Sequence, residues 1–254
     1  MCLILVVWRV HPQYPWILAA NRDEYHHRPA ATARWWADDP QVLAGRDLLA
    51  GGTWLGVNRS GGFAALTNYR GAPLRPPPTP SRGELVAGLL GRRAPIAEEL
   101  HALERIGPHY NAFNLLFSDG EQLGVHESER RAGRVLEPGI YGLSNHLLDT
   151  PWPKLRKAKS RLAAALEDLP RTQRILDLLR DEEPAADEEL PRTGVSLEWE
   201  RLLSSAFIRS AEYGTRCSTV ITMNRSGTID FDEWTWNREG APAGHVAWHF
   251  TVDR

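Results

Sequence analysis

Apolar residues gather in short continuous runs along the chain, separated by turn-forming residues. The first two runs, LILVVW (3–8) and WILAAN (16–21), flank RVHPQYP (9–15), whose prolines and polar residues suit a hairpin turn. A run that is apolar at every position is typical of a strand buried on both faces. We therefore predict that the chain opens with a buried antiparallel hairpin.

Further runs rich in β-branched and aromatic residues predict more strands. Asp119-Gly120, between two of them, is a two-residue hairpin signal, and such short connections join antiparallel strands. The predicted strands of the middle of the chain are 53–57, 62–68, 113–119 and 122–128, and those near its end are 216–223, 228–236 and 245–250.

Helical patterns lie between these two groups of strands. Ser81 and Glu84 fit a capping box, which predicts a helix that begins there and ends near Gly91. The other expected helical segments are 95–106, 153–180 as two helices broken at Pro170, and 196–210.

The order of elements, strands then helices then strands again, indicates an α+β fold with largely antiparallel sheets. The buried opening strands need cover on both faces, which favours two stacked sheets with helices packed outside them. No internal repeat and no linker divides the chain, so we expect a single domain over residues 1–254.

Charge and cysteine content narrow the classes of function. A formal charge of −2 lacks the basic excess that would neutralise phosphates, which argues against nucleic-acid binding. Cys2 and Cys217 are the only cysteines, so there is no disulfide framework and no paired-cysteine metal or haem signature. The opening apolar run lacks a basic leader and is interrupted by Arg9, so we expect no membrane span and a cytoplasmic location.

Cys2 stands directly behind the initiator methionine, and cysteine is small enough for methionine aminopeptidases to cut before it. A free thiol has a pKa of about 8.5 and needs activation at neutral pH. An α-amine on the same residue, with a pKa of about 8, can accept the thiol proton directly or through water. Removal of Met1 would therefore place a nucleophile and its base in one residue.

The polar stretch NRDE (21–24) follows the second predicted strand, where a hairpin returns the chain near its own start. Arg22 could stabilise a thiolate at Cys2, and Asp23 could orient the α-amine. The alternative is a polar turn beside a surface ion pair, and these four residues alone favour that alternative.

The combination of Met1-Cys2 with NRDE resembles the NRDE family, to which transport and Golgi organisation protein 2 of animals belongs. The similarity continues through blocks spread over nearly the whole chain. They are GGTWLGVN (51–58), AALTNYR (64–70), SRGELV (81–86), FNLLF (113–117), YGLSNHLLDTPWPK (141–154) and YGTRCSTVI (213–221).

This family in turn resembles the cysteine branch of the N-terminal nucleophile hydrolases, which have an αββα sandwich and cleave amides. The resemblance implies that Cys2 is nucleophile and base, with Arg22 and Asp23 as its immediate partners. It also implies that Asn68 and Asn145 contact the oxyanion or the substrate amide, and that Arg216 is a charge near the thiol. Amide donors suit an oxyanion, yet asparagine is also common in turns, so structural roles stay open for Asn68 and Asn145.

Two functions follow from the resemblance. The first is an amidohydrolase that uses Cys2 on a small non-peptide amide and requires no cofactor. The second is a non-catalytic carrier that uses the same pocket for intracellular haem trafficking or for acyl-coenzyme A or lipid. A carrier could retain Met1 and tolerate replacement of Cys2. The expected partner is a small-molecule amide or acyl ligand, or haem, and the sequence leaves the oligomeric state open.

Histidines supply the candidate ligands for haem or a metal. His26 and His27 are adjacent, and His245 and His249 share a strand face at even spacing. None of them has the spacing of a multi-ligand metal site, and we assign no metal site to the chain.

The segment KLRKAKSR carries five positive residues between Lys154 and Arg161 and contains all three lysines of the chain. Cations near a helix start oppose the helix dipole, so an anionic partner such as phosphate would relieve the penalty. A solvated helix face is the alternative and the commoner arrangement. Among the ten tryptophans, Trp54 is assigned to the core, whereas Trp234 and Trp236 could line a pocket or fill the core.

Overall fold

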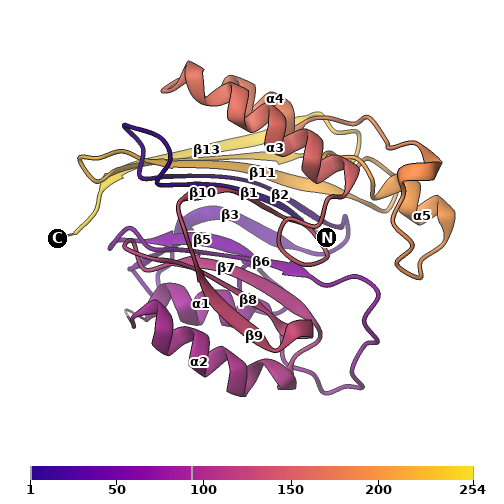
Figure 1. Cartoon of the computed structure of the whole chain (residues 1–254), viewed down its shortest axis with the longest axis horizontal. Helices are drawn as coiled ribbons and strands as arrows, with labels where there is room; N and C mark the ends of the chain where they lie inside the picture. Colours follow the sequence, from indigo (N-terminus) through magenta and orange to yellow (C-terminus); the bar gives the residue numbers. More distant parts are fainter. Residues whose placement is uncertain (1, 93, 254) are drawn as a thin grey trace.

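Two antiparallel sheets lie face to face, with a pair of helices on the outside of each. This arrangement is seen in the computed structural model, which describes residues 2–92 and 94–253 (Figure 1). Helices α3 and α4 cover one sheet, and α1 and α2 cover the other. The predicted αββα sandwich of an α+β protein is confirmed.

The first sheet has six strands in the order β10-β1-β2-β11-β12-β13, and every neighbouring pair is antiparallel. The predicted opening hairpin is confirmed and supplies two adjacent inner strands of this sheet. The strands of this six-stranded sheet are β1 (Cys2–Trp8), β2 (Trp16–Tyr25), β10 (Gly139–Leu143), β11 (Tyr213–Met223), β12 (Thr228–Trp236) and β13 (Pro242–Thr251).

The second sheet has seven strands in simple sequence order, again all antiparallel. Its strands are β3 (Ala30–Trp35), β4 (Val42–Asp47), β5 (Leu55–Asn58), β6 (Phe63–Asn68), β7 (Phe113–Ser118), β8 (Leu123–Glu127) and β9 (Ala132–Leu136). The helices are α1 (Gly83–Gly91), α2 (Ile96–Ile106), α3 (Pro153–Ala165), α4 (Gln173–Leu179) and α5 (Leu197–Leu202).

Three apolar layers hold the sandwich together. Alternation along β1 divides its side chains, so that Ile4 and Val6 enter the core between the sheets while Leu3 and Leu5 pack under α3 and α4. This explains why the run 3–8 is apolar at every position. A third layer joins α1 and α2 to the second sheet.

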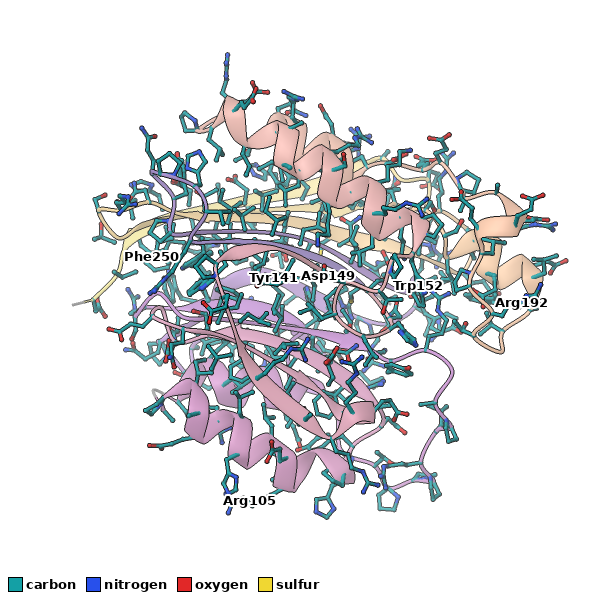
Figure 2. All side chains as sticks on the ribbon, viewed as in Figure 1. Arg105, Tyr141, Asp149, Trp152, Arg192 and Phe250 are labelled. Carbon is teal, nitrogen blue, oxygen red and sulfur yellow. The ribbon has the colours of Figure 1, made fainter. Side chains whose placement is uncertain are left out.

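The two ends of the sandwich differ. At one end Trp35 packs edge-on against Phe250, with ring centroids 4.9 Å apart. At the other end β1 begins, and Trp152 leads into α3 (Figure 2). An aromatic contact thus lies at the first end, whereas a cavity lined by polar residues lies beside the start of β1 at the second.

Several local predictions need correction. The sequence signals missed β3, β4, β9 and β10. Asp119-Gly120 lies within a connection from Ser118 to Leu123 rather than forming a two-residue turn, and the Asp119 carboxylate accepts the amides of residues 121 and 122. The capping box does not form, because the Glu84 carboxylate accepts the Tyr110 hydroxyl. The helix predicted over 196–210 ends at Leu202.

Candidate active site

Cys2 is positioned by backbone pairing at the first residue of β1. It lies in register with Arg22 of β2, and its carbonyl accepts the Ser144 hydroxyl at 3.3 Å. The thiol-bearing residue is half-buried, although the rest of β1 is fully buried. The backbone of Cys2 is therefore held by the sheet while its side chain stays within reach of a ligand.

A cavity of about 380 Å³ opens beside Cys2. Its walls come from β1, β2, the β4–β5 connection, the end of β6 and the start of α1. The lining residues that bear chemistry are Cys2, Arg22, Asp23, Glu24, Arg28, Asp47, Trp54, Asn68 and Arg82. Four of the six predicted site residues thus share one cavity.

The segment NRDE is part of β2 and forms no turn, since β2 continues to Tyr25. Alternation along the strand directs Asn21 to the helix side, where its amide donates to the carbonyls of Leu179 and Ala206. Arg22 faces the opposite side with Cys2. A strand therefore explains both the burial of these polar residues and their division of roles.

Arg22 is buried and held on two sides. Its guanidinium lies 3.5 Å from the Asp47 carboxylate and 4.3 Å from the centroid of the Trp54 ring. A charge fixed in this way keeps its position when a ligand arrives. Trp54 packs against the core, as the sequence predicts, but it is only partly buried and also lines the cavity, where Arg22 stacks on its ring.

Asp23 is 2% exposed, and its carboxylate accepts the Thr215 hydroxyl at 2.7 Å. Its backbone carbonyl also accepts the Tyr213 hydroxyl at 2.9 Å. Burial raises the pKa of Asp23, while the charges of Lys154 and Arg22 oppose that rise. The carboxylate is thus held firmly near the C-terminal end of β2, which lies beside the start of β1.

The same surroundings act on the thiol. Burial raises the pKa of Cys2, the Asp23 carboxylate adds to the rise, and the Arg22 guanidinium opposes it. The resting side chain is therefore a protonated thiol at neutral pH. A base must accept its proton before it can act as a nucleophile.

The two predicted asparagines take different positions. Asn68, at the end of β6, lines the cavity with Cys2. Asn145 is fully buried, and its amide donates to the Asn68 carbonyl at 2.8 Å. The contacts of Asn145 therefore position Asn68, and an oxyanion role for either amide stays a prediction.

Arg216 does not share the cavity lining found for Cys2. The pairing of β11 with β2 shifts register between Thr215 and Cys217, so Arg216 falls on an irregularity. Its guanidinium donates to the backbone carbonyls of Tyr25, His26 and Arg28. These contacts hold the turn after β2 rather than the thiol.

Sequence reasoning missed Asp47 and Arg82 as members of the site. Arg82 lies in the block SRGELV, which predicts a helix start and is one of the blocks of family similarity but to which we assigned no site residue, and Asp47 comes just before GGTWLGVN. The proximity of these blocks to Cys2 arises from the packing of one sheet on the other, which no local pattern encodes.

The basic run on α3 consists mostly of surface ion pairs. Lys157 and Arg161 bind Asp181, and Lys159 binds Asp149. Lys154 differs, because it is 5% exposed and donates to the Leu203 carbonyl at 2.9 Å. Burial lowers the pKa of Lys154 to about 8, and the nearby Asp23 charge opposes that shift.

The candidate haem or metal ligands lie elsewhere. His245 binds Asp232 at 2.8 Å and His249 binds Asp230 at 2.6 Å on the exposed strand β13. Within residues 2–92 and 94–253, no cluster of three or more histidine, cysteine or acidic side chains has metal-site geometry. Trp236 is buried against Phe207, which places it in the core.

Among the described residues, no helix combines the length and apolarity needed to span a membrane.

Comparison with known proteins agrees with this architecture. The chain is 10% identical to the C2A mutant of conjugated bile acid hydrolase from Clostridium perfringens, with a TM-score of 0.53 over 100% of this chain and 97% of that one. At this identity the likeness shows the fold alone, which is that of the N-terminal nucleophile hydrolases.

Sequence relatives are much closer. The chain is 38% identical to the Transport and Golgi organization protein 2 homolog of Bos taurus and 30% identical to Transport and Golgi organization protein 2 of Drosophila melanogaster, covering 92% of each chain in both cases. The family model described as Transport and Golgi organisation 2 matches residues 1–238. The chain therefore belongs to the Transport and Golgi organisation 2 family.

Proposed function

We propose that this protein is an N-terminal-nucleophile amidohydrolase that uses Cys2 on a small non-peptide amide. The observation that carries the proposal is the placement of Cys2, in register with a fixed Arg22, at the wall of an open cavity. The similar fold of a protein named a hydrolase adds support.

In the proposed reaction, removal of Met1 frees the α-amine of Cys2. This amine accepts the thiol proton, and the sulfur attacks the carbonyl carbon of the amide. The oxyanion that forms is stabilised by nearby amide donors, for which Asn68 is the candidate in the cavity wall. Collapse breaks the C–N bond, and the ammonium returns its proton to the leaving amine.

The second half of the reaction releases the acyl group. Water loses a proton to the α-amine, its oxygen attacks the thioester carbon, and the C–S bond breaks to give a carboxylic acid and the free thiol. Asp23 is proposed to orient the α-amine. Arg22 is proposed to lower the cost of the transient thiolate, since it favours the charged form of Cys2.

A cytoplasmic location belongs to the same proposal. Cys2 and Cys217 are both free thiols, as is usual for proteins in a reducing compartment.

The test combines intact-mass measurement with a panel of small aryl amides. We expect the purified chain to lack Met1, to gain a transient acyl mass on Cys2, and to release the aryl amine. Cys2→Ala should abolish both signals, whereas the matched control Cys217→Ala should keep them, because Cys217 does not line the cavity.

Retention of Met1, or equal amine release by Cys2→Ala, would contradict the hydrolase. The carrier of haem, acyl-coenzyme A or lipid predicts that ligand binding survives Cys2→Ala unchanged. A visible haem titration of the wild type and of the double variant His245→Ala/His249→Ala tests the haem form directly.

A further inference from the structure

The cavity beside Cys2 carries three guanidinium groups, from Arg22, Arg28 and Arg82. Two of them are balanced by carboxylates within the wall. Asp47 lies 2.6 Å from the Arg28 guanidinium and 3.5 Å from that of Arg22, and Glu24 lies 3.8 Å from Arg28. These two arginines are thus occupied by the protein itself.

Arg82 is the exception. It stands immediately before α1 and is half-buried. One of its nitrogens donates to the Ala112 carbonyl at 3.0 Å, and among the described residues it forms no ion pair. Guanidinium has five N–H donors and remains charged at any ordinary pH, so a single backbone contact leaves most of its capacity unused.

Arg82 and Cys2 line the same cavity, so the charge of one acts on the other. Burial lowers the pKa of Arg82, and its interaction with Cys2 opposes that shift. The Glu24 charge also favours the guanidinium, but no carboxylate of the described residues forms a direct ion pair with it. Half-burying a charge without such a direct ion pair costs free energy, and a bound anion would recover it. The planar fork of donors matches a carboxylate or a phosphate.

We propose that Arg82 is a specificity residue, which binds a carboxylate or phosphate group carried by the substrate close to the amide that Cys2 attacks. This inference rests on the proposed function and names its substrate class as anionic amides. Arg22 then serves the thiol, whereas Arg82 serves the acidic group of the substrate.

Alkylation of Cys2 tests the inference without any turnover. Iodoacetate and iodoacetamide react with a thiol in the same way and differ in one negative charge. Their rate ratio at Cys2 cancels changes in thiol ionisation, since both reagents meet the same thiolate. We expect Arg82→Gln to lower the ratio of iodoacetate to iodoacetamide about fivefold at low salt, and Arg82→Lys to keep most of it.

Arg75→Gln is the matched control. Arg75 also donates to this backbone segment, through the Tyr110 carbonyl, but it is exposed and does not line the cavity. A general loosening of residues 110–112 would affect both variants, whereas the proposed site predicts a change only in Arg82→Gln. Equal ratios in the wild type and Arg82→Gln, or an equal fall in Arg75→Gln, would overturn the inference.

Protection by small anions identifies the acidic group. Glutarate and glycerol phosphate are each tested for slowing the iodoacetamide reaction at Cys2. The anion that protects the wild type more strongly than Arg82→Gln carries the acidic group that Arg82 binds, carboxylate or phosphate. Protection that is equal in both proteins overturns the inference. If no amide is hydrolysed but Arg82→Gln still lowers the ratio of iodoacetate to iodoacetamide as expected, the hydrolase proposal fails and the anion-binding role of Arg82 stands.

Discussion

The surroundings of Cys2 and Cys217 provide two settings for one kind of side chain. The strands β1 and β11 flank β2, and both cysteines are in register with Arg22. Burial raises the pKa of each thiol, and the rise is larger for Cys217. They differ in access, because Cys2 lines the cavity while Cys217 is 5% exposed and faces the buried Glu233.

This difference leads us to expect that the position of a thiol at the end of a sheet matters more for its reactivity than its resting pKa. Cys217 lies in the interior of β11, and the neighbouring strands β2 and β12 pair with it on both sides. Cys2 is the first residue of its strand, where the sandwich opens. The predictions below test whether access or ionisation governs the contrast.

The largest expected effect is on the rate of alkylation. In the folded protein, iodoacetamide should label Cys2 at least about 100-fold faster than Cys217, because Cys217 must wait for local opening of the sheet. Peptide mass spectrometry over a time course resolves the two sites. In guanidinium chloride the two rates should converge. Similar rates in the native protein would contradict the conclusion that Cys2 is more accessible than Cys217.

The next effect is on the pH dependence of Cys2. The Arg22 charge lowers the pKa of this thiol and the Asp23 charge raises it. Arg22→Gln should therefore move the alkylation midpoint to higher pH, and Asp23→Asn should move it to lower pH. Each shift should reach up to about one pH unit, or tenfold in rate at pH 7.

Arg216→Gln is the control for these variants, since Arg216 binds the turn after β2 and should leave the midpoint almost unchanged. Shifts of Arg22→Gln and Asp23→Asn in the same direction would break the electrostatic account. Under the proposed function, Asp23→Asn should also slow hydrolysis although it speeds alkylation.

A smaller effect concerns stability. The folded pKa of Lys154, about 8, lies below its ordinary value of 10.5. The unfolded chain therefore binds more protons between these values, so this residue penalises the folded state fully below pH 8, and the penalty is relieved as the pH rises from about 8 to 10.5. Lys154→Met should remove that relief.

Urea unfolding at pH 7 and at pH 9.5 measures this difference. Relative to the wild type, Lys154→Met should lose about 2 kcal/mol of pH-dependent stabilisation. Lys159→Met, which alters a surface ion pair with Asp149 on the same helix, should not. An unchanged pH response in Lys154→Met would show that the buried lysine is not the source.

The smallest effect is expected around Cys217. The Glu233 charge adds to the raised pKa of this thiol, so Glu233→Gln should lower that pKa without exposing the sulfur. If access governs reactivity, the labelling rate of native Cys217 should stay within about threefold of the wild type. A much faster reaction, with the far-ultraviolet spectrum unchanged, would mean that ionisation limits Cys217.

Local patterns were sufficient for the central parts of both sheets. The apolar run 3–8 and its partner 16–21 form the paired strands β1 and β2, because strand formation follows from side-chain shape and the need to bury both faces. The four unpredicted strands have weaker patterns. In β9, for example, three of five residues are exposed, so its sequence lacks a clear apolar alternation.

The sequence by itself determined that Cys2 stands at the head of a buried strand and that its hairpin partner brings NRDE back toward it, because hairpin pairing is a local property of the chain. The continuation of β2 through Arg22, in register with Cys2, was shown only by the structure. Only the tertiary structure decided which charges share the cavity. Asp47 reaches Arg22 while Arg82 lacks a carboxylate partner among the described residues, and Arg216 turns to the backbone after β2. These outcomes depend on distances between segments far apart in sequence, and electrostatic and hydrogen-bonding energies follow those distances rather than residue order.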